Sequence, residues 1–167
     1  MDKTSKQPET EQPRVYEELV ITPMRAESAT DAITQLGARL QVGGFVKDSW
    51  TQATLERERT FATGLPIPEM GVAIPHTDAI HVLKPAIAVG VPDEPVEFGE
   101  MGSLDGQVPV RIICTLAMVR SESLATLLQR LIGMFQSPGV LTQIAGAQNP
   151  ADIVAIFDQH LLSAPFE

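Results

Sequence analysis

Two nearly continuous apolar runs constrain the fold of this 167-residue chain more than any other feature. They cover residues 86–91 (AIAVGV) and 108–118 (VPVRIICTLAM), and Arg111 is the main interruption. Each run is far shorter than the ~20 residues that a membrane-spanning helix needs. Runs of this length and composition are typical of strands that are covered on both faces. We therefore expect a sheet buried between helices.

Further strands and helices are expected on both sides of these runs. Shorter apolar segments predict strands at 19–22, 72–74 and 96–98, and helical periodicity predicts helices over about 28–43, 48–63, 121–136, 140–145 and 150–161. Ser28 and Ser121 are suited to cap the helices that follow them, and Asn149 before Pro150 is a typical helix start. The fold class predicted is α/β, a single domain with a mixed, mostly parallel β-sheet of about five strands flanked by helices on both faces.

Composition and charge narrow the classes of partner and compartment. Residues 1–14 are polar, charged or proline apart from the first methionine, so we expect a disordered tail followed by one folded domain over 15–167. The net charge of −9 argues against nucleic acid and anionic membranes as partners. The single cysteine, Cys114, lies in an apolar run and cannot form an internal disulfide, which fits a reducing cytoplasm. No signal peptide or membrane insertion is expected.

The most informative short segment is Gly71 to His81 (GVAIPHTDAIH). Val72 to Ile74 predicts a buried strand, and Pro75 ends it because proline offers no backbone donor. His76 then follows at the carboxyl end of the strand, where open α/β sheets bind ligands. On the residues alone, His76 could be a nucleophile, a base, a metal ligand or a hydrogen-bonded loop residue.

A metal site is one alternative at this segment. His76, Asp78 and His81 could act as ligands in a metal-dependent hydrolase. Against this reading, the chain has no further histidine or acidic cluster with ligand spacing, since His160 lies in the last predicted helix.

Several motifs together resemble a known family. Arg57-Glu58 precedes Phe61 and Thr63-Gly64, and then comes Ala73-Ile74-Pro75-His76 with Ala79-Ile80-His81 behind it. This combination resembles the enzyme IIA domains of the fructose and mannitol type in the bacterial phosphoenolpyruvate-dependent sugar phosphotransferase system (PTS), especially the galactitol-specific branch. The resemblance runs from about Tyr16 to Leu162 and identifies residues 15–167 as a type-2 EIIA domain.

The resemblance implies a phosphotransferase with a phosphohistidine intermediate and no cofactor. His76 would accept a phosphoryl group from the phosphocarrier protein HPr and pass it to a cysteine of a IIB component, which serves a membrane IIC component. Arg57 would stabilise the phosphoryl oxygens, because a guanidinium stays charged and can hold two oxygens at once. Thr63 could add a hydroxyl hydrogen bond, and His81 could assist His76.

One position departs from the mannitol and fructose pattern. Those branches carry a second histidine at the start of the helix after the last long strand, and Ser123 stands there in this chain. The galactitol branch also looks to lack this histidine. Ser123 is expected to overhang the same sheet edge as His76, and either another group, such as His81, assists His76 or no helper is needed. A regulatory IIA-like protein of the nitrogen-regulatory type, not coupled to transport, is the nearest rival function.

Overall fold

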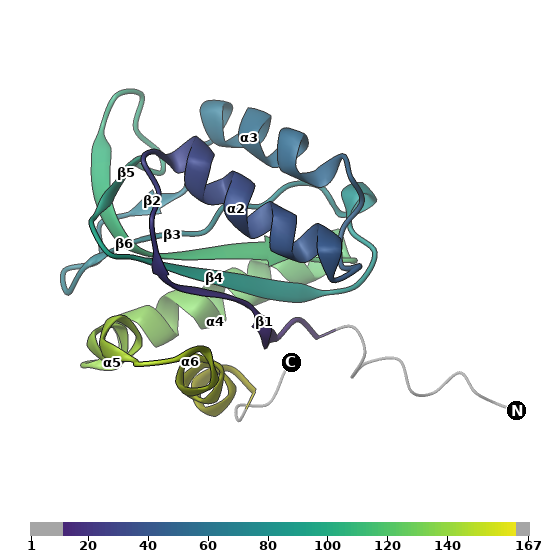
Figure 1. Cartoon of the computed structure of the whole chain (residues 1–167). Coiled ribbons are helices and arrows are strands. Elements are labelled where there is room, and N and C mark those ends of the chain that lie inside the picture. The colour runs from purple at the N-terminus through teal and green to yellow at the C-terminus, as the bar shows by residue number, and fades with distance from the viewer. Residues whose placement is uncertain (1–11, 163–167) are drawn as a thin grey trace, which may run out of the picture.

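The computed structural model describes residues 12–162, and they form a sheet between two layers of helices (Figure 1). The strands are β1 (Val15–Met24), β2 (Gly64–Leu65), β3 (Gly71–Ala73), β4 (Ala86–Pro92), β5 (Val96–Gly99) and β6 (Gln107–Ala117). The helices are α2 (Ala29–Val42), α3 (Trp50–Thr60), α4 (Leu124–Gln136), α5 (Val140–Gly146) and α6 (Pro150–Phe157). Short helical turns cover Ala79–His81, Ser121–Ser123 and Asp158–Leu162.

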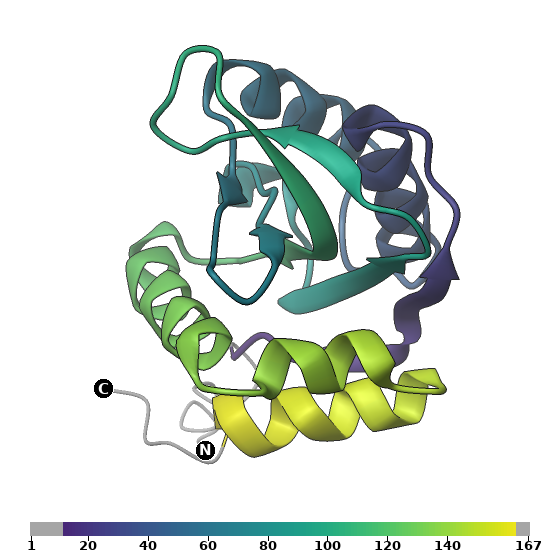
Figure 2. The ribbon, with the colours of Figure 1, turned by 90° about the vertical axis from the view of Figure 1, so that its left-hand side faces the viewer.

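The sheet is mixed, and β6 connects most of it. The strand order is β1-β4-β6-β3-β2, and β5 also pairs with β6. The pairs β1/β4 and β3/β6 are parallel, whereas β4/β6, β5/β6 and β2/β3 are antiparallel. Helices α2 and α3 cover one face, and α4, α5 and α6 cover the other (Figures 1 and 2). The predicted α/β single domain with helices on both faces of a mixed sheet is confirmed, but antiparallel pairs outnumber parallel ones among the described strands, because β6 runs antiparallel to both β4 and β5.

Alternating residues of β6 belong to two separate apolar layers. Ile112, Cys114 and Leu116 pack in the layer that contains the buried side chains of α4, α5 and α6. Ile113 and Ala117 belong to the other layer, together with the buried residues of α2 and with Trp50 at the start of α3. Trp50 is the chain's single tryptophan and is fully buried. Both faces of this strand are therefore buried from Ile112 to Ala117, as the continuous apolar composition of that part predicts.

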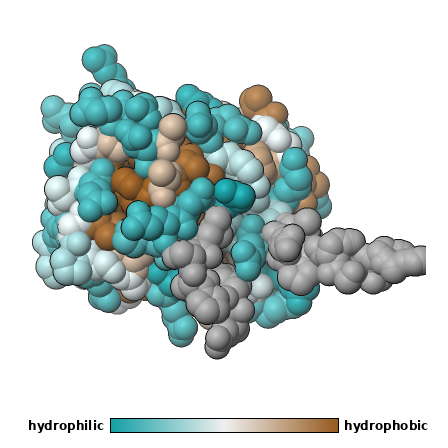
Figure 3. Space-filling view, turned by 90° about the horizontal axis from the view of Figure 1, so that it is seen from below, coloured by the Kyte–Doolittle hydropathy of each residue, from teal (hydrophilic) through white to brown (hydrophobic). Residues whose placement is uncertain are grey.

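The face of α4, α5 and α6 shows apolar surface between polar side chains when it is seen from outside (Figure 3). Partly buried apolar residues, including Leu128, Val154 and Ile156, pack against the layer beneath. No helix within residues 12–162 combines the length and apolar character that would let it cross a membrane.

Two of the predicted helix caps are confirmed and one is wrong. The Ser28 hydroxyl accepts a hydrogen bond from the amide of Asp31 (3.1 Å), and the Asn149 side chain accepts one from Asp152 (3.0 Å). Ser121 does not cap α4, because residues 121–123 form a tight turn closed by the bond from the Ser123 amide to the Arg120 carbonyl (3.1 Å). The α-helix consequently begins at Leu124.

The first described residues contact both the sheet and the last helical turn. Residues 1–11 of the predicted tail lie outside the described residues; Arg14 bonds Asp158 through its guanidinium (3.2 Å), and its carbonyl accepts from the Ile87 amide (2.9 Å). The first strand continues beyond the predicted stop at Pro23 to Met24. Because β1 lies at the edge of the sheet, a proline without a donor is tolerated there.

The Asn149 cap provides a test of how α6 is fixed. Asn149→Ala should lower the free energy of unfolding by about 1 kcal/mol, because the amide of Asp152 loses its acceptor. Asn149→Asp retains an acceptor and should stay close to the parent. Urea unfolding of the three proteins measures the difference, and equal midpoints for Asn149→Ala and the parent would contradict the role of this cap.

Candidate functional site

His76 lies directly beyond β3, next to the end of β6. The Pro75 carbonyl accepts a hydrogen bond from the amide of Leu116 (3.0 Å), and His76 itself pairs with Leu116 in a parallel bridge. Pro75 has no amide hydrogen, so the regular ladder of β3 ends before it while its carbonyl still holds the chain against β6. The His76 side chain is consequently held in a buried position, with only 8% of the residue exposed.

The imidazole of His76 is oriented by a backbone carbonyl. Nδ1 lies 2.9 Å from the carbonyl oxygen of Ile74. A carbonyl can only accept, so Nδ1 carries the hydrogen of this bond and Nε2 keeps its lone pair. Burial lowers the pKa of His76, and the positive charge of Arg57 lowers it further, while the bond to Ile74 and the charge of Asp78 act in the opposite direction. The ring is therefore neutral and nucleophilic at neutral pH.

Two hollows share His76 and Arg57. The larger one, which we call the His76 cavity, has a volume of about 430 Å³ and includes the exposed side chains of Phe61, Met101 and Leu104. Leu124 of α4 lines both hollows. The smaller hollow, of about 60 Å³, adds Thr77, Asp78, Ala79, Met118 and Ser121. The candidate nucleophile is thus reached through a rim rich in apolar side chains.

Arg57 comes from the last turn of α3. Its guanidinium carbon lies 5.1 Å from the centre of the Phe61 ring, a distance at which a cation interacts with an aromatic face. Its Nε is buried and has no hydrogen-bond partner in the described part of the chain. A permanently charged group with an unused donor beside a neutral imidazole is suited to bind an anion.

Thr63 is placed at the His76 cavity, but its hydroxyl is already engaged. Oγ1 donates to the Glu58 carboxylate (3.0 Å to Oε1) and accepts from the amide of Ile74 (3.2 Å). The amide of Thr63 also donates to Glu58 (2.9 Å). Thr63 therefore ties the end of α3 to the end of β3.

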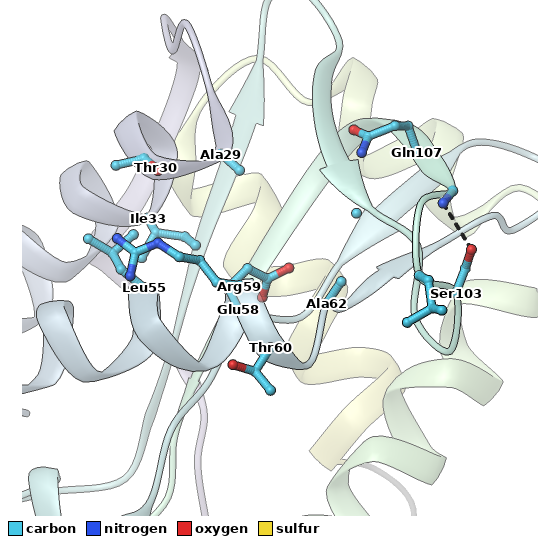
Figure 4. A pocket seen from close by; sticks show the side chains of 13 residues that line it. Ala29, Thr30, Ile33, Leu55, Glu58, Arg59, Thr60, Ala62, Ser103 and Gln107 are labelled. Carbon is cyan, nitrogen blue, oxygen red and sulfur yellow. Dashed lines mark hydrogen bonds between the residues drawn. The ribbon is translucent and has the colours of Figure 1, made fainter.

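Glu58 has an unusual environment. It lines a third cavity of about 350 Å³, between α2, α3 and the segment 99–107. In Figure 4 its carboxylate points toward Ala62, whereas the Arg59 guanidinium extends the other way, toward Ile33 and Leu55. Burial raises the pKa of Glu58 to about 7, although the two kinds of bond from Thr63 lower it. A carboxyl group of this kind changes its charge near neutral pH.

His81 and Ser123 do not line the hollows that contain His76. His81 ends the turn Ala79–His81, and its Nδ1 lies 2.8 Å from the hydroxyl of Ser49, ahead of α3. It is absent from the lining of both hollows that contain His76. Ser123 is absent from them too, because the tight turn before α4 places Ser121 and Leu124 there instead.

The metal-hydrolase alternative gains no support from this geometry. Within residues 12–162 there is no group of three His, Cys, Asp or Glu side chains arranged to hold a metal ion. His81 is engaged by Ser49, and Asp78 lines the small hollow with His76.

Sequence reasoning missed Glu58 and Phe61 as contributors to the site. Phe61 follows Arg57 by four residues, a spacing that brings side chains together on a helix and could have predicted the contact. The bond between Glu58 and Thr63 closes a turn beyond the helix end, so no periodic pattern signals it.

The electrostatic coupling of Arg57 and His76 is measurable. Arg57→Ala should raise the pKa of His76, because a nearby positive charge that disfavours the imidazolium is removed. Arg59→Ala is a matched control, since Arg59 lines neither hollow with His76. NMR titration of the His76 ring gives the pKa values, and an unchanged value in Arg57→Ala would contradict the coupling.

The family model and the relatives that match this chain all belong to the PTS. Residues 15–160 match the family model "Phosphoenolpyruvate-dependent sugar phosphotransferase system, EIIA 2". The galactitol-specific EIIA component of the PTS of Escherichia coli (strain K12) is 31% identical over 112 residues, which cover 67% of this chain and 74% of that protein. The fructose-specific EIIABC component of Bacillus subtilis (strain 168) is 28% identical over 141 residues, 82% of this chain and 21% of that protein.

Solved structures share the fold. The complex of enzyme IIA of the mannitol system with phosphorylated enzyme IIB from Escherichia coli matches with a TM-score of 0.72 and 21% identity, over 89% of this chain and 99% of that chain. The nitrogen regulatory protein IIA-Ntr from Neisseria meningitidis matches with a TM-score of 0.66 and 21% identity, over 85% and 94% of the two chains. The extent of the family match and the identity to the galactitol-specific relative establish that this chain belongs to the EIIA 2 family of the phosphoenolpyruvate-dependent sugar phosphotransferase system.

Proposed function

We propose that this protein is the phosphoryl carrier of a sugar PTS and that His76 carries the phosphoryl group. The observation that supports this most directly is the neutral Nε2 of a buried histidine, next to an arginine whose Nε has no hydrogen-bond partner within the described residues. Family membership provides the reaction class, and the residue assignment rests on this geometry.

The chemistry is a transfer between two nitrogens and then to a sulfur. The lone pair of His76 Nε2 attacks the phosphorus of phosphorylated HPr, a new P–N bond forms, and the P–N bond to the donor imidazole breaks with its electron pair returning to HPr. In the second step, the thiolate of a IIB cysteine attacks the same phosphorus and the bond to Nε2 breaks. Neither transfer uses a cofactor, and the second transfer returns His76 to its unphosphorylated form.

Arg57 stabilises the transferring group. Three equatorial oxygens share the negative charge of the phosphoryl group during transfer, so a fixed positive charge at this point lowers the barrier. Phe61 holds the guanidinium from one side, and Nε has no competing partner in the part of the chain that the structure describes. Thr63 supports this site from behind by positioning the strand end, and His81 supports the loop through Ser49.

The rim of the His76 cavity is suited to a protein partner. Phe61, Met101 and Leu104 are 60%, 41% and 106% exposed and lie around one opening, where a docking protein could cover them. The net charge of −9 favours partners with basic surfaces. HPr and a IIB component, itself coupled to a membrane IIC component, are the partners that we propose, in the cytoplasm.

The sugar proposed is galactitol or a related sugar alcohol, since the galactitol-specific relative is 31% identical. A regulatory role of the nitrogen-regulatory type is the second candidate, because that class has the same fold. Transfer from the phosphorylated protein to a galactitol-type IIB separates the two: acceptance by IIB supports transport, and refusal by all IIB proteins of the same cell supports regulation.

The phosphoryl acceptor can be tested directly. Incubation with phosphoenolpyruvate, enzyme I and HPr should add one phosphoryl group to the protein, labile in acid and stable in alkali, as expected for a P–N bond. Intact mass measurement detects it, and His76→Ala should remain unmodified, with His160→Ala as a control that still reacts. A phosphorylated His76→Ala protein would refute the assignment.

The role of Arg57 has its own test. Arg57→Ala should slow phosphorylation by phospho-HPr at least tenfold, since loss of a charge-assisted contact to a transition state costs ~2–4 kcal/mol. Arg57→Lys should be intermediate, because it keeps the charge without the planar fork. Melting temperatures should stay near that of the parent. Quenched-flow rates equal to those of the parent would exclude the role.

A further inference from the structure

We propose that Glu58 is a positioning residue for His76, and that it acts through the hydroxyl of Thr63 and the backbone of Ile74. The inference rests on the proposed function of His76 as phosphoryl acceptor and concerns what fixes the reactive nitrogen. Glu58 does not line either hollow that contains His76, so a direct contact with the phosphoryl group is not part of the proposal.

A continuous chain of polar contacts leads from Glu58 to the imidazole. The Glu58 carboxylate accepts from the hydroxyl and the amide of Thr63, at 3.0 Å and 2.9 Å. The same hydroxyl accepts from the amide of Ile74 (3.2 Å). On the other side of this residue, the Ile74 carbonyl accepts from Nδ1 of His76 (2.9 Å).

The donor and acceptor roles in these hydrogen bonds explain how Glu58 influences the orientation of His76. A hydroxyl has a single hydrogen, and a carboxylate can only accept, so Glu58 makes the Thr63 hydroxyl a donor on one side. The lone pairs of that oxygen then face the Ile74 amide. Ile74 is thereby held at its nitrogen, and its carbonyl keeps the direction that binds Nδ1 of His76. This bond leaves the lone pair on Nε2, where phosphoryl transfer needs it.

The environment of the Glu58 carboxyl makes this series of hydrogen bonds dependent on pH. In the cavity of Figure 4, α2 contributes Ala29, Thr30 and Ile33, the segment 99–107 contributes uncharged residues, and Arg59 of its own helix is the other charged side chain in the lining. Arg57, which precedes Glu58 on α3, faces the His76 cavity. Burial raises the pKa of Glu58 to about 7. Protonation occupies one of the two oxygens that Thr63 uses, so the hold on Ile74 weakens as the pH falls through 7.

Four variants separate a positioning role from a merely structural one. Glu58→Gln keeps size but loses charge, and Thr63→Val keeps shape but loses the hydroxyl. Thr63→Ser restores the hydroxyl and should restore activity. Glu56→Gln is the matched control, because Glu56 is exposed on the same helix and bonds only Gln52 among the described contacts.

Two measurements are made on each full-length variant. Long-range ¹H–¹⁵N NMR of His76 reports which ring nitrogen carries the hydrogen, from pH 5.5 to 8.5. Stopped-flow phosphorylation over a range of phospho-HPr concentrations separates kcat from KM. In Thr63→Val and Glu58→Gln we expect a mixture of ring tautomers and a kcat lowered at least tenfold, with KM within about twofold of the parent.

The pH profile provides the sharpest distinction. The ¹⁵N shifts of His76 in the parent and in Glu56→Gln should show an inflection near pH 7 in addition to the titration of the ring itself, which lies below its usual range. Glu58→Gln should lack the inflection near 7. Its persistence in Glu58→Gln, or an unchanged tautomer in both Glu58→Gln and Thr63→Val, would overturn the proposal.

The NMR measurement is independent of the phosphoryl donor. If the parent accepts no phosphoryl group from HPr, the proposed function fails while the tautomer and the inflection still decide the role of Glu58. If Thr63→Val does not fold, Glu58→Gln and the titration of the parent protein give the decision.

Discussion

Burial of β6 on both faces, from Ile112 to Ala117, is the constraint on which the rest of the structure depends. This strand pairs with β3, β4 and β5, and its alternating side chains enter two different apolar layers. Removing apolar surface from water on both sides supplies most of the driving force for such a strand. Each layer requires its own helices, so the division of α2 and α3 from α4, α5 and α6 follows from the composition of one segment. The candidate site also depends on it, because Leu116 of β6 holds Pro75 and pairs with His76.

The site must keep one side chain uncharged and a neighbouring side chain positively charged. A nucleophilic imidazole must be neutral, whereas a group that binds a phosphoryl anion must be positive. The chain meets both by burying His76 and placing a permanent cation next to it, because burial and the neighbouring positive charge both favour the neutral state of the ring. In the function that we propose, the neutral ring offers its lone pair, and the guanidinium binds the phosphoryl anion that the donor brings.

Much of the fold could be predicted from local patterns, while the contacts behind the site could not. Apolar runs predict β4 and β6, and Asn149-Pro150 predicts the start of α6, because these signals depend on burial and capping within a few residues. Adjacent motifs also single out His76 and Arg57. The bond from Thr63 to Ile74 joins residues eleven positions apart, and the turn before α4 replaces Ser123 by Ser121 at the hollow. Such features arise from three-dimensional closure, and no periodicity encodes them.

Trp50 gives this protein a built-in optical reporter. It is the chain's single tryptophan, fully buried at the first position of the helix whose last turn carries Arg57. Its fluorescence therefore senses the packing of the α2 and α3 layer without any label. Loosening confined to the opposite layer, around α5 and α6, would leave that emission largely silent, whereas circular dichroism would register it. The two signals recorded together can thus tell whether the layers on either side of the sheet come apart as one unit or in succession.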